Sequence, residues 1–189
     1  MIEEEIPEIL DSLPKRISDV VKPWAERTPE RLAVVESSGA WTYAQLSSAI
    51  ASARAWLVES GVRPGDRVMI VCENCRAFVA TLFALASLDA WPVLANARLS
   101  AQEIDQIREH CGARLVIYTT TVSHHAREHA KRHGAIIRDV PEIGPVGEGL
   151  LDESVVPEPI ETNSENSVAA LIYTSGTTGK PKGVMLTHR

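Results

Sequence analysis

Short apolar segments alternate with longer segments whose apolar residues recur at helical spacing, and this alternation constrains the fold more than any other feature. The apolar segments predict strands at 32–35, 67–71, 91–95, 114–118, 135–137, 168–173 and 184–187. The periodic segments predict helices at 44–60, 76–88, 100–112 and 122–133, with a short amphipathic helix over 17–24. This order predicts an α/β fold, in which a mostly parallel sheet carries helices on both faces.

Residues at the ends of two predicted helices support these boundaries. Thr42 is followed three residues later by Gln45, and Ser100 is followed three residues later by Glu103. Each pair predicts a capping box, in which the two side chains bond to backbone N–H groups at the start of a helix. Gly61 is the expected stop of the helix that begins after Thr42.

Length and composition narrow the class of protein. The chain has 189 residues, of which 44% are hydrophobic and 23% charged, as in one soluble globular domain or a little more. Three cysteines are too few for a disulfide framework. The longest apolar run, 77–88, is shorter than the roughly 20 residues of a membrane span, and acidic residues stand where a secretory signal would carry bases. We therefore expect a cytoplasmic protein with no membrane span.

The net charge of −6 is unevenly distributed. Residues 139–166 hold eight acidic side chains, no lysine or arginine, and several prolines and glycines, which predicts an acidic surface loop. Residues 174–189 hold three basic side chains and no acidic one, so this end suits an anionic ligand. The acidic balance argues against nucleic acid as a partner. We expect four units: an N-terminal helix and arm (1–40), an α/β core (41–138), the acidic loop (139–166), and a strand with a phosphate-binding loop that returns to the core (167–189).

Residues 174–183 form the most distinctive segment. Its hydroxyl groups can donate to phosphate oxygens, its glycines let the backbone approach a ligand closely, and its lysines supply positive charge. The candidate phosphate-binding residues are Thr174, Ser175, Gly176, Thr177, Thr178, Gly179, Lys180 and Lys182. Pro181 follows the first lysine, where a Walker A loop requires Ser or Thr. The alternative is a flexible Ser/Thr/Gly hinge, but two closely spaced lysines between apolar strands favour a phosphate site.

Two other patterns are weaker candidates for binding sites. His125, His129 and His133 recur every four residues, a spacing that can chelate a transition metal. Because charged residues surround them, we expect a polar, solvent-facing stripe instead. Cys72 and Cys75 form a single CxxC pair, which lacks a full set of zinc ligands, so we expect cysteines that pack at the end of a strand and assign no metal site.

The segment YTSGTTGKPKGVMLTHR, residues 173–189, resembles the signature loop of the adenylate-forming superfamily, which includes acyl-CoA synthetases, luciferases and the adenylation domains of peptide synthetases. The segments at 41–46 (WTYAQL), 65–68 (GDRV), 91–94 (WPVL) and 96–100 (NARLS) are also similar to this family. The resemblance covers most of residues 17–189. Thr178 and the MLTHR ending are more similar to an acyl-CoA synthetase.

The resemblance implies a two-step ligase that uses ATP, Mg²⁺ and coenzyme A. A carboxylate attacks the α-phosphate of ATP to form an acyl-adenylate, and a thiol then displaces AMP. It implies that the hydroxyl residues of the loop bind phosphate oxygens, that its glycines shape the backbone, and that Lys180 or Lys182 offsets the charge of pyrophosphate. Fatty acid metabolism is among the processes that this resemblance suggests.

Family members continue for several hundred residues beyond the signature loop, and their catalytic residues lie there. We therefore expect an N-terminal part of the enzyme that is inactive alone, contains no catalytic residue, and self-associates through apolar surface. Two alternatives stay open. The parent is an amino-acid-activating domain that loads a carrier protein, or the chain is a non-catalytic module that binds nucleotide or pyrophosphate.

Overall fold

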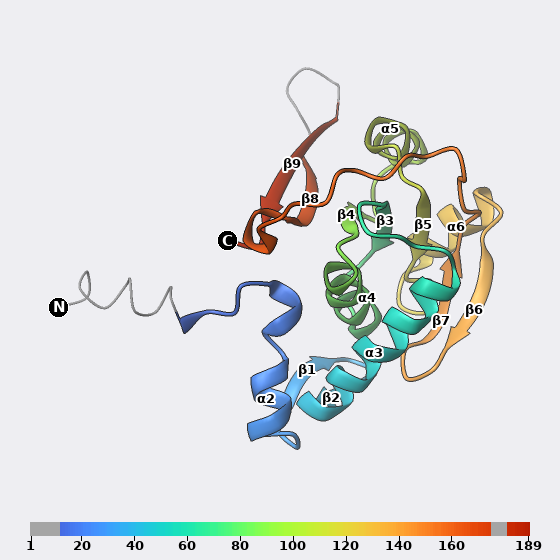
Figure 1. Ribbon diagram of the computed structural model, residues 1–189. Coiled ribbons are helices and arrows are strands. Elements are labelled where there is room, and N and C mark those ends of the chain that lie inside the picture. Colours follow the sequence, from blue (N-terminus) through green and yellow to red (C-terminus); the bar gives the residue numbers. More distant parts are fainter. Residues whose placement is uncertain (1–11, 175–180) are drawn as a thin grey trace.

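The structure, a computed structural model, describes residues 12–174 and 181–189 and is built around a seven-stranded sheet (Figure 1). The strand order is β6-β7-β5-β3-β4-β8-β9. Four adjacent strands run parallel, namely β5 (Leu115–Tyr118), β3 (Arg67–Cys72), β4 (Trp91–Asn96) and β8 (Val168–Thr174). Antiparallel strands complete both edges, with β7 (Gly144–Glu148) and β6 (Ile136–Val140) beside β5, and β9 (Lys182–Thr187) beside β8. The prediction of an α/β fold with a mostly parallel sheet is confirmed.

Helices cover both faces of this sheet, which explains the continuous apolar sequence of its central strand. In β3, Val68 and Ile70 face α3 (Tyr43–Glu59) and α4 (Arg76–Ser87), whereas Met69 and Val71 face α5 (Ala101–Cys111) and α6 (His124–Arg132). All four side chains are fully buried. Strands buried on both sides gain hydrophobic stabilisation from every residue, so they lose the alternation of a half-exposed strand.

The predicted helix boundaries are confirmed by the cap geometry. Thr42 and Gln45 form a capping box at the start of α3, and Ser100 and Glu103 form another at the start of α5. Gly61, just after the end of α3, has φ +84°, a left-handed conformation that an L side chain adopts only with strain.

The N-terminal region forms a smaller layer beside α3 and α4. It contains a 3₁₀ turn at Ile17–Asp19, α2 (Lys22–Arg27), and an antiparallel hairpin of β1 (Leu32–Glu36) and β2 (Gly39–Thr42). The single helix expected over 17–24 is therefore two short elements, since Pro23 lies in the first turn of α2 and starts a new helix there. Strand β2 was not predicted from the sequence. None of the described helices combines the length and apolarity needed to cross a bilayer.

The acidic segment 139–166 differs from the predicted loop. Residues 144–148 form β7, and β6 continues through Asp139 and Val140. The charge pattern hid this hairpin because its apolar residues are few and scattered, with Val140 and Val146 in the core and Ile143 packed against it. Gly147 also fits closely against β5, since a Cβ there would lie 3.1 Å from the Tyr118 Cβ. The segment that follows runs along the core rather than away from it, because Asp152 donates its N–H to the Arg114 carbonyl at 2.8 Å.

The prediction that the three histidines of residues 125–133 face solvent was wrong for two of them. His125 is exposed, but His129 is buried, and His133 is largely covered where its Nε2 donates to Asp105 at 2.8 Å. The interpretation of the cysteines as packing residues is confirmed, since all three are buried and free. The Sγ of Cys75 also accepts the Phe78 N–H at the start of α4.

Candidate functional site

The carboxyl ends of β3 and β4 meet at the point where the chain changes sides of the sheet. After β3 the chain enters α4 on one face, and after β4 it enters α5 on the other. In open α/β sheets, the helices that leave in opposite directions open a crevice between the two strand ends, and ligands bind there. The topology therefore selects this edge as the candidate site before any side chain is considered.

An open cleft with a volume of about 540 Å³ lies at this edge. Glu73 and Asn74 follow β3, and Asn96 and Arg98 come from the end of β4 and the turn after it. Tyr173, near the end of β8, closes the third side. The lining thus combines a carboxylate, two amides, a guanidinium and a phenol, which suits a polar ligand with hydrogen-bonding groups.

Glu73 connects the guanidinium at this cleft to a serine hydroxyl at the start of α6. Its Oε2 accepts from Arg98 Nη2 at 3.1 Å, and its Oε1 accepts from Ser123 Oγ at 2.9 Å. These hydrogen bonds, led by the one from Arg98, lower the pKa of Glu73, so it stays ionised at neutral pH. The Oδ1 of Asn96 accepts the Arg98 N–H at 2.9 Å. Arg98 is therefore held at the rim of the cleft, although its side chain is 69% exposed.

The buried histidine of α6, His129, holds the turn that carries Arg98. His129 Nε2 lies 3.1 Å from the Ala97 carbonyl oxygen and 3.0 Å from that of Leu99, so it donates to the backbone on both sides of Arg98. Sequence reasoning missed this role. The available signal was that Ala126 and Ala130 flank His129 on one helical face, and this apolar spacing indicates a face that packs on the sheet.

The β8–β9 hairpin borders the cleft and frames the predicted phosphate loop. Tyr173 pairs with Gly183 and Thr174 pairs with Lys182 across the hairpin. A Cβ on Gly183 would lie 2.6 Å from Leu171 Cδ2 and 3.2 Å from the Tyr173 ring. A side chain at this position would press first on Leu171 and then on the tyrosine ring, which packs across the glycine. The phenol oxygen lies 2.7 Å from His110 Nδ1 at the end of α5, and burial raises the pKa of Tyr173 to about 12.

The structure places only two of the eight predicted phosphate-binding residues. Thr174 ends β8 beside the cleft, and Lys182 begins β9 as its partner in the register. Lys182 is exposed, and no ion pair to it occurs among residues 12–174 and 181–189. The other six residues lie outside the described parts of the chain, namely Ser175, Gly176, Thr177, Thr178, Gly179 and Lys180. Their role stays a prediction.

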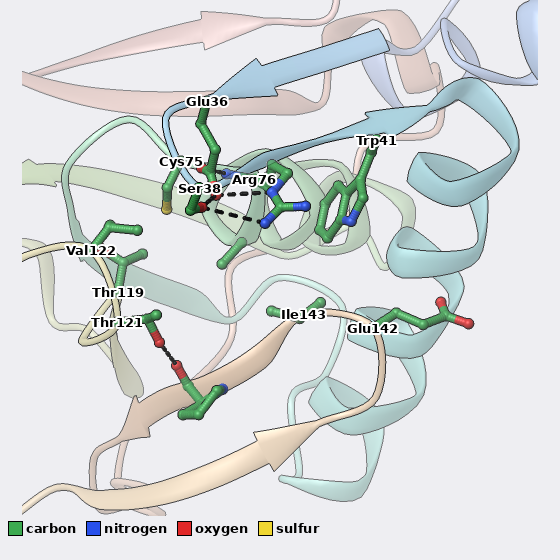
Figure 2. A pocket seen from close by; sticks show the side chains of 12 residues that line it. Glu36, Ser38, Trp41, Cys75, Arg76, Thr119, Thr121, Val122, Glu142 and Ile143 are labelled. Carbon is green, nitrogen blue, oxygen red and sulfur yellow. Dashed lines mark hydrogen bonds and ion pairs between the residues drawn. The ribbon is translucent and has the colours of Figure 1, made fainter. Parts of the chain in front are cut away.

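A smaller cavity of about 80 Å³ lies where the β1–β2 hairpin meets the start of α4 (Figure 2). Glu36 accepts from the Arg76 N–H at 2.9 Å and from Arg76 Nε at 2.8 Å, and Arg76 Cζ lies 5.1 Å from the centre of the Trp41 ring. Burial raises the pKa of Glu36, but hydrogen bonds from Ser38 and Arg76 outweigh it, and the pKa is lowered. The Arg76 guanidinium is already bound to Glu36 and packed on Trp41. We therefore interpret this cavity as part of the packing between the hairpin and α4, and not as a ligand site.

The described part of the chain contains no cluster of side chains that could bind a metal ion. No group of three or more His, Cys, Asp or Glu side chains there is arranged to hold a metal ion. Burial raises the pKa of the Cys72 thiol to about 12, so this thiol is neither a ready ligand nor a nucleophile at neutral pH.

Comparisons of sequence and of structure relate this chain to known proteins. Residues 21–189 match the family model described as AMP-binding enzyme. A feruloyl-CoA synthase from Amycolatopsis sp is 38% identical over 164 residues, which are 87% of this chain and 32% of that protein. The 4-coumarate–CoA ligase 3 of Oryza sativa subsp. japonica is 33% identical, covering 82% of this chain and 28% of that protein. The chain thus spans about a third of the length of these relatives.

Solved structures agree with the sequence relatives. The N-terminal domain of FACL13 from Mycobacterium tuberculosis, in an inhibitor-bound crystal structure, superposes with a TM-score of 0.71 at 28% identity, covering 93% of this chain and 45% of that one. An O-succinylbenzoate coenzyme A synthetase from Bacillus subtilis, in complex with AMP, gives a TM-score of 0.63 at 30% identity, with coverage of 88% and 41%. The family match, the relatives and the shared fold agree, and the chain belongs to the AMP-binding enzyme family, whose members form adenylates.

Proposed function

We propose that this chain is the N-terminal part of an AMP-forming acid–thiol ligase that activates a carboxylate with ATP and transfers the acyl group to coenzyme A. The observation that carries this proposal is the register of Lys182 on the β8–β9 hairpin, where it pairs with Thr174, the residue that follows Tyr173 at the wall of the polar cleft. A cationic side chain with no ion-pair partner in the described structure can offset the charge of a phosphate chain at that edge.

The residues at this edge offer groups that can bind the phosphates and polar atoms of Mg·ATP. Lys182 offers an ammonium group for the phosphate chain, and Asn74 and Asn96 line the cleft with groups that can donate and accept hydrogen bonds. Mg²⁺, when bound with ATP, supplies charge neutralisation on the phosphates. Positioning and charge stabilisation are what phosphoryl chemistry chiefly requires of a protein, and these residues do that work from the strand ends.

The choice of coenzyme A as acceptor rests on the relatives. Feruloyl-CoA synthase and 4-coumarate–CoA ligase are named for coenzyme A thioesters, and they are 38% and 33% identical. The nonribosomal peptide synthetase gliP of Aspergillus fumigatus is 31% identical over 164 residues, so an amino-acid-activating domain that loads a carrier protein is the second candidate. We therefore start the substrate panel with ferulic and 4-coumaric acids, followed by fatty acids and amino acids.

A carboxylate-dependent exchange between ATP and labelled pyrophosphate tests the first half-reaction. The assay uses the intact protein that contains this chain, with each carboxylate of the panel in turn. We expect exchange with at least one acid and a reduction of about tenfold or more in Lys182→Ala, since a charged contact to phosphate is lost. Lys131→Ala is the matched control, because Lys131 is an exposed lysine on α6.

The outcomes separate the candidates. Exchange with hydroxycinnamic or fatty acids, followed by coenzyme A thioester formation, supports the proposal. Exchange with amino acids alone favours the carrier-loading domain, and binding of pyrophosphate with no exchange favours a non-catalytic module. We expect residues 1–189 alone to give no exchange, and activity of this fragment would refute that expectation.

A further inference from the structure

Tyr173 is fixed by two neighbours that belong to different elements. Its ring packs over the bare backbone of Gly183 on β9, and its phenol meets His110 of α5 at 2.7 Å. The two rings stand edge to face, with centroids 5.7 Å apart and an interplanar angle of 87°. A residue held on one side by packing and on the other by a hydrogen bond has little freedom to change rotamer.

This contact occurs where the backbone support of β8 ends. The register between β4 and β8 runs through Val93–Leu171 and Leu94–Ile172. Tyr173 and Thr174 lie beyond these pairs, and their backbone partners are Gly183 and Lys182 on the exposed strand β9. The phenol–imidazole bond therefore connects the end of the hairpin to α5, on the face of the sheet that α5 and α6 cover.

We propose that His110 is a positioning residue for Lys182, the cation assigned to phosphate above. It acts by holding Tyr173 and, through the Tyr173–Gly183 and Thr174–Lys182 pairs, the placement of Lys182 at the end of the hairpin. This inference rests on the proposed function of Lys182. His110 is an exposed residue of the last turn of α5 that does not line the cleft, and it contacts the cleft wall through Tyr173.

Hydrogen exchange in residues 1–189 tests the anchor without any assumption about activity. His110→Phe keeps an aromatic ring but removes Nδ1, and Tyr173→Phe removes only the hydroxyl. Each should speed amide exchange in peptides covering 171–174 and 182–187 by about fivefold, the effect of one lost hydrogen bond. The double variant should be no faster than either single one, because both remove the same interaction. Glu109→Gln, an exposed change on the same helix, is the control.

Kinetics of the intact protein test the link to the phosphate site. His110→Phe should raise the KM for Mg·ATP in the exchange reaction by about fivefold and leave the KM for the carboxylate unchanged. His110→Asn should restore the wild-type value, because its Oδ1 can accept from the phenol where Nδ1 did. Unchanged exchange rates at the hairpin overturn the proposal, as does an unchanged KM for Mg·ATP in an active enzyme. If the wild-type protein shows no carboxylate-dependent exchange, the proposed function fails, and hydrogen exchange still decides whether His110 anchors the hairpin.

Discussion

Replacing Asp66 with asparagine should destabilise the whole domain. Asp66 is fully buried in the turn before β3 and is held by two arginines. Its Oδ1 accepts from Arg63 Nη2 at 3.0 Å, and its Oδ2 lies 3.0 Å from the Nε of Arg114. The side chain of Arg114 is only 7% exposed, whereas that of Arg63 is 45% exposed. Only the Arg114 pair is therefore shielded from water on both sides.

The magnitude follows from this difference in burial. Asp66→Asn leaves the Arg114 guanidinium buried without a counter-charge, which costs about 3–5 kcal/mol when one partner of a buried pair is removed. Arg63→Ala removes a half-exposed partner and should cost about 1 kcal/mol or less. Since a domain of this size is stable by roughly 5–15 kcal/mol, both changes are measurable by urea unfolding followed by circular dichroism.

A double variant sharpens the test. Asp66→Asn combined with Arg114→Met removes both charges, so it should cost less than the sum of the two single changes. If Asp66→Asn lowers the free energy of unfolding by less than about 1 kcal/mol, or if the double variant is fully additive, the argument from burial is refuted.

Three further outcomes follow from the packing. Gly65 has φ +81°, and a Cβ there would collide with the Glu158 carbonyl oxygen. Gly65→Ala should therefore lower the free energy of unfolding in urea by about 2 kcal/mol or more. An unchanged midpoint would show that the backbone near residue 158 does not pack on this turn. Burial lowers the pKa of His133 in the folded protein from 6.5. The neutral imidazole therefore contributes its full stability above pH 6.5, and this contribution is lost as the pH falls towards the folded pKa. In His133→Gln, the free energy of unfolding should depend less on pH below 6.5. The three buried thiols should react with a thiol reagent at least about 100-fold more slowly in the native protein than in denaturant, and rapid native labelling would contradict their burial.

Local signals in the sequence were sufficient for the parallel core. Capping boxes at Thr42 and Ser100 and a glycine stop at Gly61 act within one helical turn, so they are independent of tertiary context. Strand β3 is a continuous apolar run because both of its faces are covered. Such features are visible without knowing which strands are neighbours.

Features that depend on distant partners could not be predicted. Strand β7 has little apolar character, and it forms because β5 and β6 provide backbone partners on both sides. His129 has charged neighbours in sequence, but the backbone oxygens of Ala97 and Leu99 satisfy its imidazole in the interior. The Glu73–Arg98 pair joins residues 25 positions apart and carries no motif.

For the candidate site, the sequence predicted a phosphate-binding loop, and the fold located a cleft at the ends of β3 and β4. Thr174 and Lys182 pair across the β8–β9 hairpin, whose strand β8 lies beside β4, while the roles of the six residues 175–180 stay predictions. The proposed division at residues 40, 138 and 166 also stays a prediction.

The most direct test of the central claim is the nucleotide product formed by the intact protein in the presence of ATP, coenzyme A and its preferred carboxylate. Chromatography should show AMP and acyl-CoA appearing in equal amounts, with pyrophosphate as the third product. Formation of ADP and inorganic phosphate, or thioester formation without AMP, would contradict an AMP-forming ligase.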